Sequence, residues 1–229
     1  MRIGSDADIS VSPSLLQQPV ERILSFLNTA VTENRRFLIA MAGVPGSGKS
    51  TLAAQFEAEV DHRAGSGFFV ALAMDGFHYS KAKLRSMLDP DAAMARRGAP
   101  WTFNAAELQA RLVLLKNGDT AVAWPGFEHE IGDPIEAAVT VPASVRVILV
   151  EGLYLMHPAD GWETIGPLFD ERWYLDTPFE VAMERLVGRH MKAWGITREE
   201  AVERIARNDG LNGRVVEATR SYADWLCTA

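Results

Sequence analysis

A glycine-rich segment, residues 43–51, has the residue types needed to hold a phosphate group. It reads Gly-Val-Pro-Gly-Ser-Gly-Lys-Ser-Thr, which fits the P-loop pattern G-x-x-x-x-G-K-[ST]. Glycines let such a loop turn tightly and point successive N–H groups at an anion. Average residue usage produces this pattern by chance in roughly one chain of this length in a hundred. The nucleotide contacts predicted here are Gly43, Pro45, Gly46, Ser47, Gly48, Lys49, Ser50 and Thr51.

Two acidic residues follow apolar runs, at the points where strands would end. Asp75 comes directly after residues 68–74, and Glu151 comes directly after residues 145–150. A carboxylate beside a γ-phosphate can take the proton of a substrate hydroxyl, which is the role predicted for Asp75. Both acids are also predicted contacts of Mg²⁺, together with the Ser50 hydroxyl. The alternatives are that Asp75 caps the next helix and that Glu151 accepts from a loop amide.

Two basic segments lie outside these motifs. Arg96 and Arg97 open a basic and aromatic stretch, residues 96–104, which favours an anionic or hydroxyl-rich substrate. A solvated pair at a helix end is the alternative for these two. Arg185 and Arg189 are four residues apart on a predicted helix, so they could close over the phosphates and neutralise charge in the transition state. The alternative is that Glu184 and Arg185 only cover an exposed face and that Arg189 pairs with a neighbouring residue.

Apolar patterns predict the elements that position these groups. Continuous apolar runs are typical of strands buried on both faces of a parallel sheet, and they occur at residues 37–42, 68–74, 145–150 and 173–175. Helical spacing, with capping signals in places, occurs at residues 19–31, 51–60, 104–116, 178–194 and 197–208. A last short strand is predicted around Val215 and Val216. This alternation predicts a three-layer α/β/α sandwich with a mainly parallel sheet, where ligands bind at the carboxyl ends of the strands.

Composition limits the class of protein. The chain has 229 residues, of which 48% are hydrophobic and 23% charged, and this predicts a single globular domain over residues 1–229 with residues 1–13 frayed. The net charge of −7 argues against a nucleic-acid partner. No apolar run reaches the roughly 18 residues needed to cross a membrane. One cysteine, Cys227, and a polar N-terminus without the apolar core of a signal peptide predict a cytoplasmic protein.

Seven segments, taken in order, resemble the P-loop small-molecule kinases. They are GVPGSGKS, MDGFHYS, RRGAPWTF, FEHEIGDP, VEGLYLM, DTP and RLVGRH, and the likeness extends over about residues 20–220. This superfamily includes uridine kinase, phosphoribulokinase and bacterial pantothenate kinase. The chain is most similar to the bacterial branch labelled fructose transport system kinase or nucleoside-kinase-like.

The resemblance implies the P-loop nucleoside triphosphate hydrolase fold, with a small helical lid at about residues 185–200. It implies ATP and Mg²⁺ as cofactors and, as acceptor, a hydroxyl of a nucleoside, a pantothenate-like alcohol, a sugar or a sugar phosphate. By position, the catalytic residues are Asp75, Lys49, Arg185 and Arg189, the metal contacts are Ser50, Asp75 and Glu151, and the acceptor pocket holds His78, Tyr79, Arg97 and His129. Asn104 stands where uridine kinases carry a substrate-contacting aspartate, so uridine itself is not specified. A homodimer is left open.

Two other functions compete with a kinase. A GTP-driven switch protein would need the guanine-selecting sequence N-K-x-D, whereas residues 116–119 read Lys-Asn-Gly-Asp. A regulatory ATPase that hydrolyses ATP to change shape would need no acceptor pocket. In that case neither Asp75 nor residues 96–104 would have a chemical task.

Overall fold

A five-stranded sheet forms the centre of the protein, and its neighbouring strands are all parallel. The computed structural model describes residues 13–118, 120–128 and 131–228. The strand order is β2 (Phe69–Ala73), β5 (Val147–Gly152), β1 (Phe37–Ala42), β6 (Glu171–Asp176) and β7 (Trp225–Thr228). This arrangement confirms the predicted mainly parallel sheet.

Strands β1 and β5, which pair with each other in the sheet, show why their sequences are apolar without alternation. Every residue of both strands is buried. Leu38 and Ala40 pack into one core of the protein, while Ile39 and Met41 pack into the other. Because successive side chains point to opposite faces, a strand covered on both faces needs apolar residues at every position.

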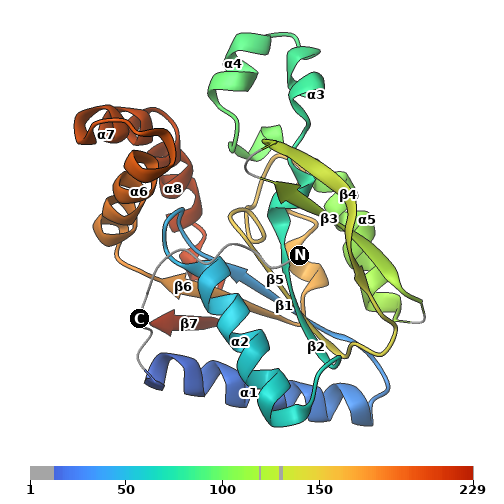
Figure 1. Cartoon of the computed structure of the whole chain (residues 1–229). Coiled ribbons are helices and arrows are strands. Elements are labelled where there is room, and N and C mark those ends of the chain that lie inside the picture. Colours follow the sequence, from blue (N-terminus) through green and yellow to red (C-terminus); the bar gives the residue numbers. More distant parts are fainter. Residues whose placement is uncertain (1–12, 119, 129–130, 229) are drawn as a thin grey trace.

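Helices cover the two faces of the sheet (Figure 1). The first core joins β1 and β5 to α5 (Ala105–Asn117) and to an antiparallel hairpin of β3 (Val122–Glu128) and β4 (Asp133–Val141). The second core joins the sheet to α1 (Pro13–Thr32) and α2 (Lys49–Ala64). The protein is therefore a three-layer α/β/α sandwich with the hairpin added on the α5 side.

Two smaller groups of helices stand beyond the sheet. The helical group, as we call it, consists of α6 (Phe179–Trp194), α7 (Arg198–Arg207) and α8 (Asp209–Glu217). The short helices α3 (Lys81–Arg85) and α4 (Pro90–Ala95) project separately, above the hairpin in Figure 1. Short 3-10 turns are η1 (Met74–Phe77), η2 (Pro100–Thr102), η3 (Gly166–Leu168) and η4 (Arg220–Tyr222). Within the described ranges, no helix is both long and apolar enough to span a membrane.

The capping residues predicted for the ends of three helices are confirmed. The Asn104 side chain accepts from the N–H of Glu107 at the start of α5. Thr197 and Glu200 form a capping box at the start of α7. Gly118 and Gly195 end α5 and α6 in the left-handed backbone region, at φ of 78° and 64°. A side chain disfavours that conformation, which is why glycine marks these ends.

One predicted strand needs correction. Val215 and Val216 lie in helix α8, where Val216 is fully buried, so the strand predicted there is wrong. The last strand is instead β7, which pairs with β6. The hairpin β3–β4 was not predicted, and of the frayed region predicted over residues 1–13 only Pro13 is described, at the start of α1.

Candidate active site

The glycine-rich loop, residues 43–48, joins β1 to α2 at the carboxyl edge of the sheet. We call it the phosphate loop. Gly48 has φ of 99° and precedes Lys49, the first residue of α2. Gly46 has φ of 78°, and a Cβ atom there would overlap the carbonyl oxygen of Ala182 in α6. The loop can therefore take this shape only with glycine at these two positions. Its backbone and the N-terminus of α2 together form a ready site for an anion.

Lys49 is held inside this loop. Its Nζ donates to the carbonyl oxygens of Gly43 (2.9 Å) and Val44 (3.2 Å). Burial lowers the pKa of Lys49, and the charges of Glu151 and Asp75 act in the opposite direction. Burial disfavours the charged form of Lys49, so an anion bound next to its ammonium group would stabilise that charge.

Glu151 lies beside the loop because β5 is the neighbour of β1. In the register of these two strands it is paired with Met41, and its Oε1 accepts from the Ser50 hydroxyl at 2.8 Å. Burial raises the pKa of Glu151, while Lys49 and the Ser50 hydroxyl lower it. The alternative, a bond to a loop amide, is not what the structure shows.

The Ser50 and Glu151 oxygens fit a magnesium ion. A hydroxyl and a carboxylate are the hard oxygen donors that Mg²⁺ prefers, and proteins commonly hold it through one or two such groups plus substrate phosphates. Among the residues that the structure describes, no three His, Cys, Asp or Glu side chains could hold a metal by themselves. These two oxygens would thus bind Mg²⁺ together with phosphates rather than alone.

Asp75 lies one strand further from the loop than Glu151, since β5 separates β2 from β1. It sits in η1, half-buried, and its charge acts on Lys49, Glu151 and Tyr154. It does not cap the next helix, because the Ser80 side chain accepts from the Lys83 N–H at the start of α3. The structure therefore brings Asp75 to the same edge as the phosphate loop.

An aromatic wall adjoins Asp75. The Nδ1 of His78 is 2.8 Å from the backbone oxygen of Asp75, and its ring lies 3.9 Å from the ring of Phe103 and 4.7 Å from that of Phe127. Tyr154 packs edge-on against Phe103 at 5.6 Å. Phe103 and Tyr154 are buried, so the accessible part of this wall is formed by the half-buried rings of His78 and Phe127.

The guanidinium groups of Arg96 and Arg97 donate hydrogen bonds to other groups of the protein. Arg97 donates to the carbonyl oxygen of Tyr79 (3.1 Å), to Oδ1 of Asp133 (3.1 Å) and to the carbonyl oxygen of Gly132. Arg96 donates to protein acceptors as well. The two side chains are therefore neither a solvated pair at a helix end nor a pair left available for an anion. They give no support to an anionic substrate.

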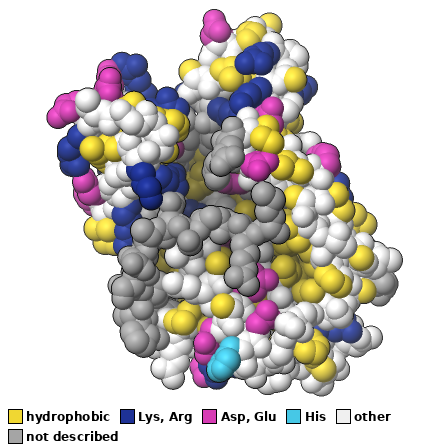
Figure 2. All heavy atoms as spheres, viewed as in Figure 1, with side chains coloured by type: hydrophobic (Ala, Val, Ile, Leu, Met, Phe, Trp, Pro, Cys, Tyr) yellow, Lys and Arg dark blue, Asp and Glu magenta, His cyan; other side chains and the backbone are white. Residues whose placement is uncertain are grey.

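Arg185 reaches the phosphate loop from α6. Its Nη1 donates to the carbonyl oxygen of Ser47 at 3.1 Å, and the Thr177 hydroxyl donates to the same oxygen at 3.0 Å. Arg189, one turn further, is exposed and its charge lowers the pKa of Lys49. Figure 2 shows the molecule hollowed between the helical group and the part with α3 and α4, with Lys and Arg side chains on both sides of the hollow.

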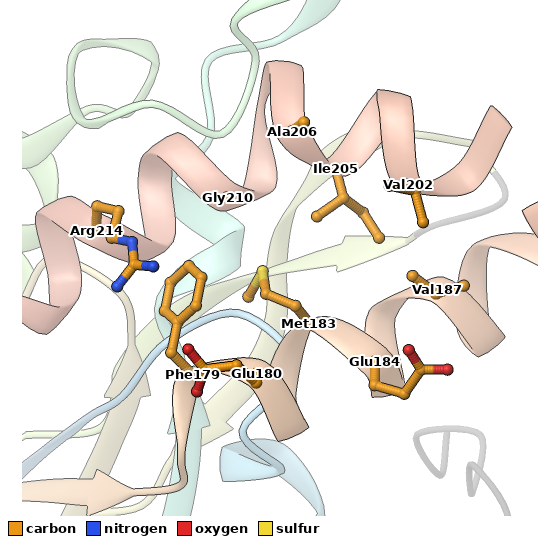
Figure 3. Close-up of a pocket in the computed structure, with 10 residues that line it drawn as sticks. All are labelled: Phe179, Glu180, Met183, Glu184, Val187, Val202, Ile205, Ala206, Gly210 and Arg214. Carbon is orange, nitrogen blue, oxygen red and sulfur yellow. The ribbon is translucent and has the colours of Figure 1, made fainter. Parts of the chain in front are cut away.

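A separate groove of about 400 Å³ lies on the other face of α6. Phe179 and Met183 from α6 point toward Ile205 of α7 across it (Figure 3). None of the predicted site residues lines this groove.

Of the predicted site residues, the loop, Asp75, Glu151 and Arg185 come together, and His78, Tyr79 and Arg97 lie around the aromatic wall. His129 falls outside the described residues. Sequence reasoning missed four residues of this site: Phe103, Phe127, Tyr154 and Thr177. They lie in the RRGAPWTF, FEHEIGDP, VEGLYLM and DTP segments, so their place in those motifs was the available signal.

The chain is similar to known proteins over most of its length. The family described as "Phosphoribulokinase / Uridine kinase family" matches residues 38–228. The chain belongs to this family. It is therefore a P-loop kinase of the uridine kinase and phosphoribulokinase type, which acts on small metabolites, and the resemblance drawn from the motifs is confirmed.

Two curated relatives cover most of the chain. A protein of Schizosaccharomyces pombe named "Putative uridine kinase C227.14" is 40% identical over 221 residues, which are 95% of this chain and 90% of that protein. The Escherichia coli "Uncharacterized protein YggC" is 32% identical, over 86% of this chain and 79% of that protein.

Two solved structures are also similar. The "putative fructose transport system kinase" of Silicibacter sp. TM1040 has 31% identity and a TM-score of 0.77, over 89% of this chain and 98% of that one. YFH7 of Saccharomyces cerevisiae, titled "a putative P-loop containing kinase with a circular permutation", has a TM-score of 0.80 at 19% identity, over 93% of this chain and 98% of that one. The second likeness is one of fold alone.

Proposed function

We propose that this kinase transfers the γ-phosphate of ATP to a hydroxyl of a small metabolite, with Mg²⁺ as its metal cofactor and the cytoplasm as its location. The observation that carries the proposal is the meeting of Lys49, Ser50, Glu151 and Asp75 at one edge of the sheet. A basic group, two metal-type oxygens and a separate carboxylate are the parts that phosphoryl transfer requires.

The phosphate side of the reaction falls to the loop. Backbone N–H groups of residues 43–48 and the Lys49 ammonium would hold the β- and γ-phosphates. Ser50 and Glu151 would hold Mg²⁺, which neutralises charge on the phosphate oxygens when bound. Arg185, already in contact with the Ser47 backbone, and Arg189 would add positive charge from α6 as the transition state forms.

Asp75 would act on the acceptor. It would orient the hydroxyl and accept its proton as the hydroxyl oxygen attacks the γ-phosphorus. A new phosphorus–oxygen bond forms while the bond from the γ-phosphorus to the bridging oxygen breaks, which leaves ADP. The half-buried setting of Asp75 at the strand end supports this role.

The surroundings of Asp75 favour an uncharged acceptor. The half-buried rings of His78 and Phe127 supply flat apolar surface, which suits a nucleoside or a similar alcohol. Arg96 and Arg97 donate to protein acceptors, so they do not favour a sugar phosphate. The name of the Schizosaccharomyces pombe relative supports the nucleoside class, while Asn104 leaves uridine itself unspecified.

The test is a panel of nucleosides, pantothenate-like alcohols, sugars and sugar phosphates incubated with the protein and Mg-ATP. ADP release above the substrate-free background, with one class of acceptor and with the phosphorylated product seen by mass spectrometry, is expected. ADP release that no acceptor changes would instead favour the regulatory ATPase. Absence of both nucleotide binding and ADP release would overturn the proposal.

A further inference from the structure

We propose that the adjacent residues Arg96 and Arg97 are positioning residues that couple the helical group to the hairpin β3–β4. The inference rests on the proposed function, because it links the nucleotide side of the site to the acceptor side. Residues 96–98 run from the end of α4 toward η2 and lie between the two parts they join.

Arg96 holds the helical group. Its Nη1 donates to the carbonyl oxygen of Arg207, the last residue of α7, at 3.0 Å, and its Nη2 donates to Oδ1 of Asn212 in α8 at 3.0 Å. In return, Nδ2 of Asn208 donates to the carbonyl oxygen of Arg97 at 2.8 Å. Three hydrogen bonds thus attach the junction of α7 and α8 to this segment, and each involves a side chain.

Arg97 holds the hairpin from the same segment. Its guanidinium donates to Gly132 and Asp133 at the start of β4 and lies 5.4 Å from the ring of Phe127 in β3. Asp133 also accepts from the Lys81 N–H at 2.8 Å, so the carboxylate is shared with the start of α3. The hairpin therefore depends on Arg97 where it adjoins the aromatic wall.

Gly98 anchors the segment to the core. The Tyr154 hydroxyl donates to the Gly98 carbonyl at 2.5 Å, and the Gly98 N–H donates to the Thr102 hydroxyl at 2.9 Å. Gly98 has φ of 101°, a conformation that other residues rarely adopt. The two arginines consequently extend from a fixed backbone, and a movement of α7 and α8 is transmitted to the hairpin.

The two ends of this link touch opposite sides of the site. The helical group carries Arg185, which contacts the phosphate loop at Ser47. The hairpin carries Phe127, which packs on His78 next to Asp75. Nucleotide binding that shifts α6 should therefore tighten the hairpin around the acceptor. Arginine is needed because its fork donates to two separate acceptors at once, whereas a lysine ammonium is a single point.

Hydrogen–deuterium exchange tests the coupling without any knowledge of the acceptor. We expect Mg-AMPPNP, a non-hydrolysable ATP analogue, to slow exchange in the wild type both over residues 198–217 and over residues 131–141. Arg96→Gln should bind the analogue with a Kd within about threefold of the wild type, since Arg96 lies outside the phosphate contacts. In Arg96→Gln the analogue should no longer slow exchange in the hairpin. Arg96→Lys should retain part of the response.

The control is Arg172→Gln, which breaks the bidentate pair of Arg172 with Asp224 beside β6 and β7 and should leave the hairpin response intact. Should Arg96→Gln fail to fold in a melting experiment, Arg96→Lys carries the test. A hairpin that responds fully in these Arg96 variants, or not at all in the wild type despite binding, overturns the coupling. A wild type that binds no nucleotide overturns the proposed function instead.

Discussion

Lys49 and Glu151 are two opposite charges at the buried base of the phosphate loop. Burial lowers the pKa of Lys49 and raises that of Glu151, and each charge counteracts the shift of the other. Removing either charge alone would take from the other an opposite charge that offsets the cost of its burial. At the scale of the residue, the phosphates of a bound nucleotide would stabilise the Lys49 ammonium, and its Mg²⁺ would stabilise the Glu151 carboxylate.

If Asp75 accepts the proton of the acceptor hydroxyl, its replacement should slow phosphotransfer and leave ATP binding unchanged. Asp75→Asn keeps the shape of the side chain but removes its basicity, so phosphotransfer should fall by roughly 100- to 10,000-fold. The Kd for ATP, measured by calorimetry, should stay close to that of the wild type. Asp91→Asn, an exposed position in the first turn of α4, serves as the control. Undiminished phosphotransfer by Asp75→Asn would show that another group takes the proton.

Gly76 should be intolerant of any side chain, because β3 passes directly over it. A Cβ atom there would overlap the backbone carbonyl of Pro125. We expect Gly76→Ala to destabilise the protein by about 1–3 kcal/mol, a cost typical of overpacking, measured as a lower midpoint in urea at unchanged slope.

Gly188 is the matched control for that variant. It lies in α6 at a position where a Cβ atom would meet open space, so Gly188→Ala should stabilise by about 0.5–1 kcal/mol. Equal midpoints for the two alanine variants would contradict the close approach of β3.

At the scale of the element, α6 is joined to α8 through a buried histidine. Nε2 of His190 lies 3.6 Å from Oδ2 of Asp209, and its ring packs against Trp194. Burial lowers the pKa of His190, Asp209 raises it, and Arg189 and Arg204 lower it. The folded protein therefore prefers the neutral imidazole.

This preference predicts acid sensitivity of the helical group. The unfolded chain takes up the proton at a pH of about 6.5, before the folded chain does. Stability is accordingly complete above that pH and declines as the pH falls toward the lowered pKa of His190. His190→Gln should show a shallower decline of melting temperature between pH 7 and 5. His62→Gln, at an exposed position in α2, should decline like the wild type, and parallel curves for all three would contradict the prediction.

At the scale of the whole molecule, sheet order decides which strand ends meet. Placing β5 between β2 and β1 sets Glu151 next to the phosphate loop and Asp75 one strand beyond, with α6 closing from the β6 side. The acceptor would then lie beside the hairpin, and the nucleotide would lie beside the helical group.

Nucleotide binding should stabilise the whole fold by mass action. At Mg-ATP concentrations 100 times the Kd, the free energy of unfolding should rise by about 2.7 kcal/mol. Lys49→Ala should lose most of that increase, because the loop then lacks its cation. Lys116→Ala, at the end of α5, should keep it, although its ion pair with Asp170 is lost. A ligand-induced shift of equal size in Lys49→Ala would remove Lys49 from the phosphate contacts.

Much of the site was predictable from local sequence, because the causes are local. The phosphate loop needs its glycines and lysine in one short segment, and strands buried on both faces need continuous apolar runs. The helix caps at Asn104 and Thr197 likewise join residues three positions apart. These features were recognisable before any contact between distant segments was known.

Tertiary contacts decided the rest. The hairpin strand β3 contains Pro125 and Gly126 at an irregularity in its register, so local preference disfavoured it, and packing of Trp124 in the core stabilises it. Val215 and Val216 favour a strand locally, yet core packing keeps them in α8. Arg96 finds its acceptors 111 and 116 positions away along the chain. No local pattern encodes such a partner, because only the folded path of the chain brings the two segments together.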